Sequence, residues 1–88
     1  MRMYEIRFER SVDKLYRRLP KKLIVRLDQA ILALADDPRP PGCKKLAGER
    51  DYWRIRVGDW RIIYTIQDDM LLIVVVEVAP RGDAYRNL

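Results

Sequence analysis

Three apolar segments in the second half of the chain are separated by only two residues each. They run from about Asp51 to Val57, from Trp60 to Gln67 and from Met70 to Ala79, with Gly58-Asp59 and Asp68-Asp69 between them. Two-residue connections of this composition are typical of tight hairpins, which join antiparallel neighbours. We therefore predict an antiparallel meander, and the rest of the chain must pack against it.

The N-terminal part of the chain shows a strand pattern and then a helix pattern. Apolar and polar residues alternate from Met3 to Phe8, which predicts a short half-buried strand. A helix is predicted to begin near Glu9 to Ser11, with Ser11 as its N-cap. Its apolar stripe has helical spacing and consists of Val12, Leu15, Tyr16 and Leu19.

A second helix is predicted from about Pro20 to Asp36, because proline suits the first turn of a helix. Its apolar stripe consists of Leu23, Leu27, Ala30, Ile31 and Leu34. Residues 36–42 contain three prolines and a glycine, which end the helix and favour an extended connector. The two helices, joined by almost no loop, should form an antiparallel hairpin whose apolar stripes need a sheet to cover them.

The length of 88 residues allows one domain, because so short a chain buries only about 60% of its unfolded surface. We predict a single α+β domain over residues 1–88, in the order strand, helix, helix, strand, strand, strand. The N-terminal strand and the antiparallel two-helix hairpin should pack on an antiparallel four-stranded sheet, followed by a short C-terminal segment.

Composition excludes several classes of function. The chain has no histidine and a single cysteine, Cys43, so neither an ordinary zinc site nor an internal disulfide is expected, and we predict no metal and no cofactor. The longest apolar run, Met70 to Val76, is too short to cross a bilayer, and no signal peptide is recognisable. We therefore expect a cytoplasmic protein without a membrane partner.

Eighteen Lys and Arg residues against 13 Asp and Glu residues give a net charge of +5, which favours polyanionic partners. Alternation in the strands directs Trp53, Ile55 and Val57 toward the helices. It also directs Ile73 and Val75 to the same open face as Glu77. The charged residues expected on this open face are Arg54, Arg56, Arg61, Glu77 and Arg81.

The clustering of these arginines has two interpretations. Like charges on neighbouring strands cost stability, which a bound polyanion such as nucleic acid would relieve. Alternatively, each arginine covers the sheet with its stem and keeps its head in water, and Glu77 forms a surface ion pair with Arg61 or Arg81.

Three motifs in the second half carry a resemblance to a known family. They are Lys44-Lys45-Leu46-Ala47-Gly48, the segment from Tyr52 to Tyr64, and Val78-Ala79-Pro80-Arg81-Gly82-Asp83-Ala84-Tyr85-Arg86. With the preceding strand, helical hairpin and Pro-rich connector, the chain resembles the RelE branch of the RelE/ParE toxin superfamily over nearly its whole length. The resemblance implies a RelE-like fold and a type II toxin that enters the ribosomal A site and cuts mRNA. A cognate antitoxin that wraps around the fold would neutralise it.

The resemblance also implies a metal-independent reaction in which the ribose 2'-OH attacks the adjacent phosphate. It assigns Arg61 and Arg81 to stabilising the charge that gathers on the phosphoryl oxygens. Tyr85 corresponds to the C-terminal aromatic residue that stacks on or orients the scissile nucleotide. The residues expected to hold the RNA are Lys44, Lys45, Arg54 and Arg56.

Two positions depart from the family pattern. Several relatives carry lysine at the position of Arg54, and arginine is a poor replacement for a lysine base because its guanidinium keeps its proton. The proton acceptor is then Tyr85, Glu77 or Glu49, or catalysis rests on alignment and charge stabilisation alone. Pro80 stands where relatives often carry a histidine or a second basic residue.

Two alternatives to the nuclease remain open. One is a ParE-like inhibitor of DNA gyrase, which uses the same fold without nuclease chemistry. The other is an inactive relative that only binds its antitoxin. Partner binding also has two interpretations at Tyr16, which either contributes to an apolar surface for a partner helix or packs against the sheet.

Overall fold

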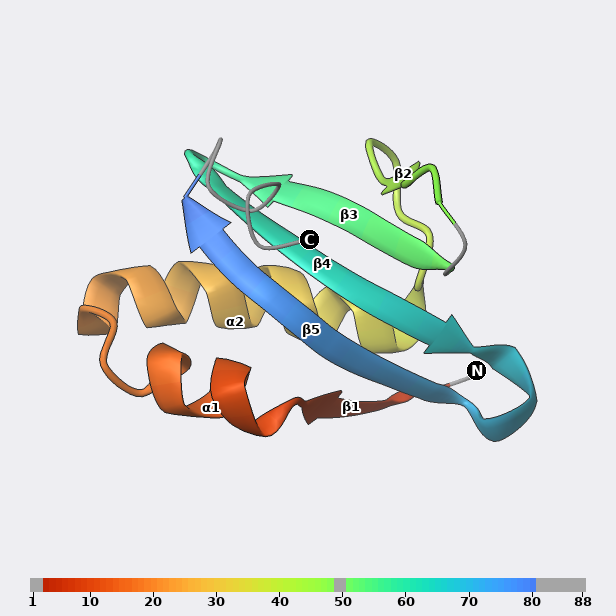
Figure 1. The fold of residues 1–88 in the computed structure, drawn as a ribbon, viewed down its shortest axis with the longest axis horizontal. Helices are drawn as coiled ribbons and strands as arrows, with labels where there is room; N and C mark the ends of the chain where they lie inside the picture. Colours follow the sequence, from red (N-terminus) through yellow and green to blue (C-terminus); the bar gives the residue numbers. More distant parts are fainter. Residues whose placement is uncertain (1–2, 49–50, 81–88) are drawn as a thin grey trace.

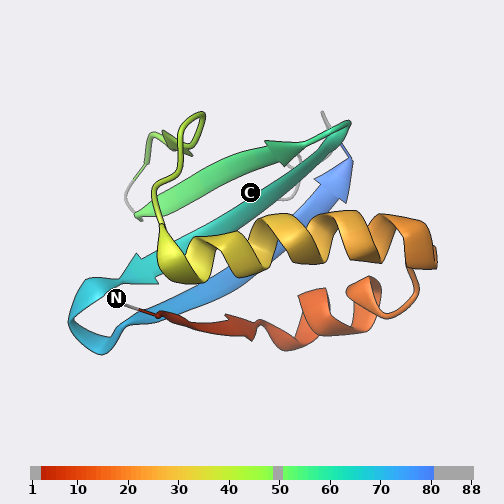
Figure 2. The ribbon, with the colours of Figure 1, turned by 180° about the vertical axis from the view of Figure 1, so that it is seen from behind.

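In the described part of the chain, five strands form one sheet and two helices cover one of its faces (Figure 1; Figure 2 shows the helices in front). The computed structural model describes residues 3–48 and 51–80. Along the chain the elements are β1 (Glu5–Phe8), α1 (Arg10–Tyr16), α2 (Lys21–Asp36), β2 (Lys44–Lys45), β3 (Tyr52–Val57), β4 (Trp60–Gln67), the 3-10 turn η1 (Asp68–Met70) and β5 (Leu72–Pro80). The predicted α+β class, with its helical hairpin and meander, is confirmed.

The sheet order is β1-β5-β4-β3-β2, so the sheet has one strand more than predicted. β1 pairs with β5 in parallel, from Glu5 opposite Leu72 to Phe8 opposite Val75, whereas the sequence analysis expected only antiparallel pairs. The added strand, β2, is too short to show a periodicity in the sequence. The helix pair carries the chain across the sheet from β1 at one edge to β2 at the other.

The main core lies between the helices and the sheet. α2 buries Leu27, Ile31 and Leu34 of the predicted stripe, and it also buries Ala35, which was not predicted. α1 begins at Arg10, so Ser11 lies inside the helix and the prediction that it is the N-cap was wrong. α1 buries Val12 and Tyr16, while Leu15 is 44% exposed. Tyr16 therefore packs in the core, 5.0 Å from the ring of Phe8, and its hydroxyl donates a hydrogen bond to Asp28.

A β-bulge in β5 determines which side chains face the helices. Ile63 lies opposite Glu77, whereas the next residue, Tyr64, lies opposite Val75, so Val76 is the extra residue. Because of this residue, Ile73, Val75 and Val78 are all fully buried in the main core. The prediction that Ile73 and Val75 share the open face with Glu77 was therefore wrong. These two side chains lie in the main core, whereas Glu77 lies on the face opposite the helices.

The turn after β4 is also longer than the expected two-residue hairpin turn. It forms η1 and closes with Leu71 at φ 50, in the left-handed region. Tyr4 donates a hydrogen bond of 2.7 Å to Asp68 in this turn, and Arg39 of the connector forms a 2.9 Å ion pair with the same carboxylate. The guanidinium of Arg39 also lies 5.0 Å from the ring centroid of Trp53. These contacts tie the Pro-rich connector to the end of the sheet.

Neither helix in the described part of the chain is long and apolar enough to span a membrane.

The connector is also held by the Tyr64 hydroxyl, which donates a 2.7 Å hydrogen bond to the carbonyl oxygen of Pro38. Burial raises the pKa of this hydroxyl well above its usual value, so it keeps its proton and remains a donor. The connector therefore enters β2 from a fixed position.

Candidate nucleic-acid interface

The register of β2, β3 and β4 brings basic residues together on the face opposite the helices. Arg56 lies directly opposite Arg61, and in the neighbouring row Arg54 lies between Lys44 and Ile63. Residues directly opposite one another in antiparallel strands have Cβ atoms about 5 Å apart. Three strands therefore place Lys44, Arg54, Arg56 and Arg61, which we call the arginine face, within one small area.

The arginine face is less open than the sequence suggested. Arg54 is only 5% exposed and Arg61 only 6%, whereas Arg56 is exposed. A second small core lies on the same face and consists of Ile63, Ala79, Leu46, Tyr52 and Val76. The expectation that these arginines lie on an open surface was therefore wrong for Arg54 and Arg61, which are buried.

Burial of a guanidinium has a chemical consequence. Removing a charge from water is costly, and electrostatic interactions inside a site of low dielectric constant are stronger than those at the surface. Arginine also keeps its charge at any accessible pH. Arg54 and Arg61 therefore provide permanent, positioned positive charges, and Arg56 beside them is accessible to a ligand.

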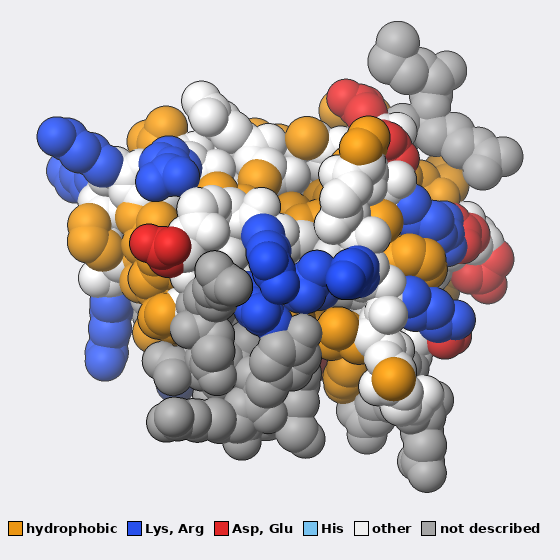
Figure 3. Space-filling view, turned by 90° about the horizontal axis from the view of Figure 1, so that it is seen from above, with side chains coloured by type: hydrophobic (Ala, Val, Ile, Leu, Met, Phe, Trp, Pro, Cys, Tyr) orange, Lys and Arg blue, Asp and Glu red, His pale blue; other side chains and the backbone are white. Residues whose placement is uncertain are grey.

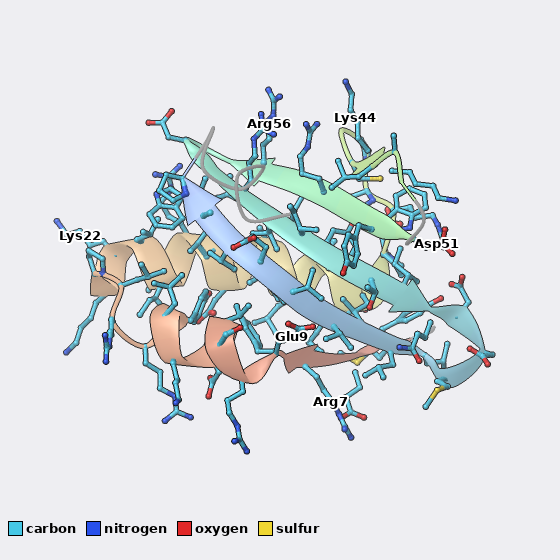
Figure 4. All side chains as sticks on the ribbon, in the orientation of Figure 1. Arg7, Glu9, Lys22, Lys44, Asp51 and Arg56 are labelled. Carbon is cyan, nitrogen blue, oxygen red and sulfur yellow. The ribbon has the colours of Figure 1, made fainter. Side chains whose placement is uncertain are left out.

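The side chains of Arg56 and Lys44 extend to the same side of the molecule, beyond the edge of the sheet (Figure 4). Seen from that side, Lys and Arg side chains gather in the middle of the surface (Figure 3). Lys45 pairs with Trp53, which packs in the main core, so its register position is on the other face from Arg54. Lys45 forms a 3.2 Å ion pair with Asp51 instead.

Glu77 is the carboxylate nearest to the arginine face in register. It lies opposite Ile63, which separates it from Arg54, and it is half-buried. Burial raises the pKa of Glu77, and the negative charge of Glu9 raises it further. A carboxyl group with a raised pKa is better suited to proton transfer near neutral pH than an ordinary one. The role of Glu9 was not predicted, because it arises from the parallel pairing of β1 with β5.

An apolar recess lies beside the arginine face. It has a volume of about 450 Å³ and is lined by Ala30, Ala33, Pro40, Pro41, Gly42, Ile55 and Arg56. The pairing of β3 with β2 ends at Arg54, so Ile55 and Arg56 belong to the edge of the sheet. This recess was not predicted from the sequence. Its only signal was the small residues of α2 and the Pro-Pro-Gly run of the connector.

The cations of the arginine face are suited to holding an anion. Among residues 3–48 and 51–80, no three Cys, Asp or Glu side chains lie close enough together to hold a metal ion. Fixed cations beside an accessible one can hold a phosphodiester and stabilise the charge that develops on it. Arg81, Tyr85 and Glu49 lie outside the described residues.

Comparison with known proteins identifies the family. The model of the ParE toxin of type II toxin-antitoxin systems matches residues 3–85. The chain is 25% identical to a protein of Methanocaldococcus jannaschii named as toxin RelE1, over 96% of this chain and 97% of that protein. It is 29% identical to a protein of Escherichia coli named as RelE-like, over 93% of this chain and 90% of that protein.

Solved structures show the same relationship. The fold is similar to that in the RelE–RelB complex of Pyrococcus horikoshii, with a TM-score of 0.80, 30% identity and coverage of 93% of this chain and 99% of that chain. It is also similar to the RelBE2 toxin-antitoxin complex of Mycobacterium tuberculosis, with a TM-score of 0.80, 25% identity and coverage of 94% and 97%. The chain therefore belongs to the ParE toxin family of type II toxin-antitoxin systems, within the RelE/ParE superfamily.

Proposed function

We propose that this toxin is a ribosome-dependent mRNA endoribonuclease of the RelE type, which cuts mRNA in the ribosomal A site and so inhibits translation. The observation that carries the proposal is the arginine face, on which the buried Arg61 lies directly opposite the exposed Arg56. An inhibitor that acts only by protein contact does not need positioned guanidinium groups, whereas phosphoryl transfer does.

The reaction joins the ribose 2'-oxygen to the adjacent phosphorus and breaks the bond from phosphorus to the 5'-oxygen. The proton of the 2'-OH passes to an acceptor, and the leaving 5'-oxygen gains a proton. The products are a 2',3'-cyclic phosphate and a free 5'-OH, and the reaction needs no metal. Arg61 stabilises the phosphoryl oxygens together with Arg81, and Tyr85 orients the scissile nucleotide. The proposed RNA-binding residues are Lys44, Arg54 and Arg56; Lys45, which the sequence also suggested, lies on the other face from Arg54 and is left out of the proposal.

Three residues are candidates for the proton acceptor: Tyr85, Glu77 and Glu49. Of these we propose Glu77. Its raised pKa supports this role, because a more basic carboxylate accepts a proton more readily. Its position one residue across from Arg54 supports the role as well, since Ile63 alone separates the two in register.

We also propose a cognate antitoxin as the partner of this chain and the cytoplasm as its location. The similar proteins of Pyrococcus horikoshii and Mycobacterium tuberculosis are toxin-antitoxin complexes. The net charge of +5 supports both an anionic antitoxin and an RNA substrate. A ribosome-dependent nuclease acts where translation takes place.

The test is expression in bacteria followed by mapping of mRNA 5' ends. The wild-type toxin should arrest growth and produce cuts within translated codons, and the Arg61→Ala variant should produce neither. The matched control is Arg7→Ala, which removes an exposed arginine of β1 and should remain toxic. Full mRNA cleavage by Arg61→Ala would contradict the proposal.

The family model favours a second candidate, because it is that of the ParE toxin. A ParE-like inhibitor would trap gyrase on broken DNA and leave mRNA intact. The same cultures distinguish the two candidates. Gyrase-linked DNA breaks with intact mRNA would contradict the nuclease and support the gyrase inhibitor. Harmless expression with retained antitoxin binding would indicate the inactive relative.

A further inference from the structure

A second basic surface lies on the helical hairpin, and neither the family assignment nor the arginine face accounts for it. Residues 10–26 contain seven basic residues and a single acidic residue, Asp13. The remaining residues of the chain contain eleven basic and twelve acidic residues, so this segment alone accounts for the net positive charge. Its seven cations, which we call the basic hairpin surface, are all exposed: Arg10, Lys14, Arg17, Arg18, Lys21, Lys22 and Arg26.

These cations are held by two packed helices rather than by a loop. α1 and α2 lie together on the face of the sheet opposite the arginine face (Figure 2). Lys22 extends from the end of the hairpin where the two helices are joined (Figure 4). Of the seven cations, Arg17 alone forms an ion pair within the described residues, a 3.1 Å contact with Asp13 at an exposed position, which contributes little to stability.

The basic hairpin surface reaches the end of the sheet at the β3–β4 turn. The guanidinium of Arg26 lies against Gly58, so closely that a Cβ atom at this glycine would be 2.7 Å from Nη2. Gly58 directly follows the end of β3, two residues after Arg56. Arg26 therefore lies where the helical surface meets the turn next to the arginine face.

The chemistry of the surface fits a phosphate backbone better than bases or a protein. The only aromatic residue of the segment, Tyr16, is buried, so the surface offers no ring on which an unpaired base could stack. Within residues 10–26 only two large apolar side chains are exposed, Leu15 and Val25, against seven exposed cations. Exposed cations on a rigid support are suited to a regular array of phosphates.

We propose that the basic hairpin surface binds the sugar-phosphate backbone of a base-paired nucleic acid, separately from the strand held by the arginine face. The surface contacts phosphates, which folded RNA and duplex DNA share, and it reads no sequence. This binding is independent of whether the arginine face cleaves RNA.

The test uses the full chain with Arg61→Ala, so that bound RNA stays intact. The hairpin variant adds R18Q/K21Q/K22Q, and the matched control adds M3E/Q67E/M70E at exposed positions away from both basic surfaces. Each set lowers the net charge by three units, the first by removing three cations and the second by adding three carboxylates. Fluorescence anisotropy measures the affinity of both proteins for an RNA hairpin, a DNA duplex of the same sequence and single-stranded RNA over a series of KCl concentrations.

The hairpin variant should lose at least about tenfold in duplex affinity near 100 mM KCl, and its log–log salt slope should become shallower by about 2 to 3. The control should keep the salt slope of the parent. A larger loss on the RNA hairpin assigns the surface to folded RNA, and a larger loss on DNA assigns it to duplex DNA. Equal losses in the hairpin variant and the control, no loss, or a loss confined to single-stranded RNA would each overturn the proposal.

A second measurement does not depend on the folding of a variant. Lysine acetylation of the Arg61→Ala protein, with and without the RNA hairpin or the DNA duplex, should show at least about threefold protection of Lys14, Lys21 and Lys22 at duplex saturation. Unchanged acetylation of these three lysines at saturation would overturn the proposal.

Discussion

Arg56 and Arg61 lie directly opposite each other on β3 and β4, yet Arg61 is almost completely buried while Arg56 is exposed. Opposed like charges destabilise a sheet, and a buried charge adds a desolvation cost. An anion bound between the two guanidinium groups would offset both costs. The pair is the relationship on which the proposed anion-binding role of the arginine face depends.

The first prediction concerns Arg61→Met, which keeps much of the buried stem and removes the charge. The variant should remain folded and lose less than about 2 kcal/mol of unfolding free energy, because removing the charge relieves its repulsion by Arg56 opposite. RNA cleavage should fall at least about 100-fold, because the phosphoryl oxygens lose a positioned cation. Urea denaturation and a cleavage assay on the same preparation check both outcomes. A loss of several kcal/mol would mean that Arg61 has a mainly structural role.

The second prediction concerns the pH dependence of Glu77. A carboxyl whose pKa is raised in the folded state binds its proton more tightly there, so its contribution to stability falls as pH rises through the interval between the unfolded and folded pKa values. Glu77→Gln should remove this decline, and stability curves for the variant and wild type at several pH values provide the check.

The same carboxylate predicts a kinetic effect. If Glu77 accepts the proton of the 2'-OH, Glu77→Gln should lower the cleavage rate by about 100-fold or more. Glu9→Gln should move the acid limb of the pH–rate profile to lower pH, because the Glu9 charge helps to raise the pKa of Glu77. Pre-steady-state cleavage measured across pH tests this, and an unshifted limb in Glu9→Gln would exclude Glu77 as the group that titrates.

The third prediction concerns the bulge at Val76. Deleting Val76 should make the pairs Tyr64–Val75 and Ile63–Glu77 consecutive, so Val78 stays in the core and Glu77 stays on the face opposite the helices. We expect a folded variant that loses about 1 kcal/mol of unfolding free energy, because only the half-buried side chain of Val76 is removed. The control deletes Val78 instead, which moves Ala79 to the buried position opposite Ile62 and should cost at least about 3 kcal/mol. Urea denaturation checks both variants, and similar stabilities would show that Val76 is not the extra residue of the bulge.

The fourth prediction concerns Gly58 in the β3–β4 turn. Its φ of 59 lies in the left-handed region, so Gly58→Ala should cost about 1 to 2 kcal/mol. The new Cβ would also displace the flexible end of Arg26. Thermal unfolding of Gly58→Ala, Arg26→Ala and the double variant separates the two effects. If Gly58→Ala lowers stability equally in the Arg26→Ala background, the loss comes from the backbone conformation. If the loss disappears in that background, it comes from the contact with Arg26.

Much of the fold could be predicted because its signals are local. Repeating apolar residues fix the buried side of α2, and a two-residue turn fixes the pairing of β3 with β4. Alternation also predicts correctly that Trp53, Ile55 and Val57 face the helices. For the same reason it brings Arg54, Arg56 and Arg61 to one face.

The remainder depends on contacts between distant segments. The extra residue of the β5 bulge is one valine in a run of three, which leaves no trace in the pattern. Parallel pairing of β1 with β5, which brings Glu9 near Glu77, joins opposite ends of the chain. Alternation assigns a side chain to a face but says nothing of what covers that face, so the burial of Arg54 and Arg61 could not be predicted.

Cleavage of mRNA on purified translating ribosomes tests the central claim most directly. Wild-type toxin added to ribosomes paused on a defined mRNA should cut within the A-site codon. The buffers are freed of metal ions with EDTA and then supplied only with the magnesium that ribosomes need. The fragments should carry a 2',3'-cyclic phosphate and a 5'-OH, and Arg61→Met should leave the mRNA intact while Arg7→Ala cuts it. Intact mRNA with wild-type toxin, or equal cutting by Arg61→Met, would contradict the account.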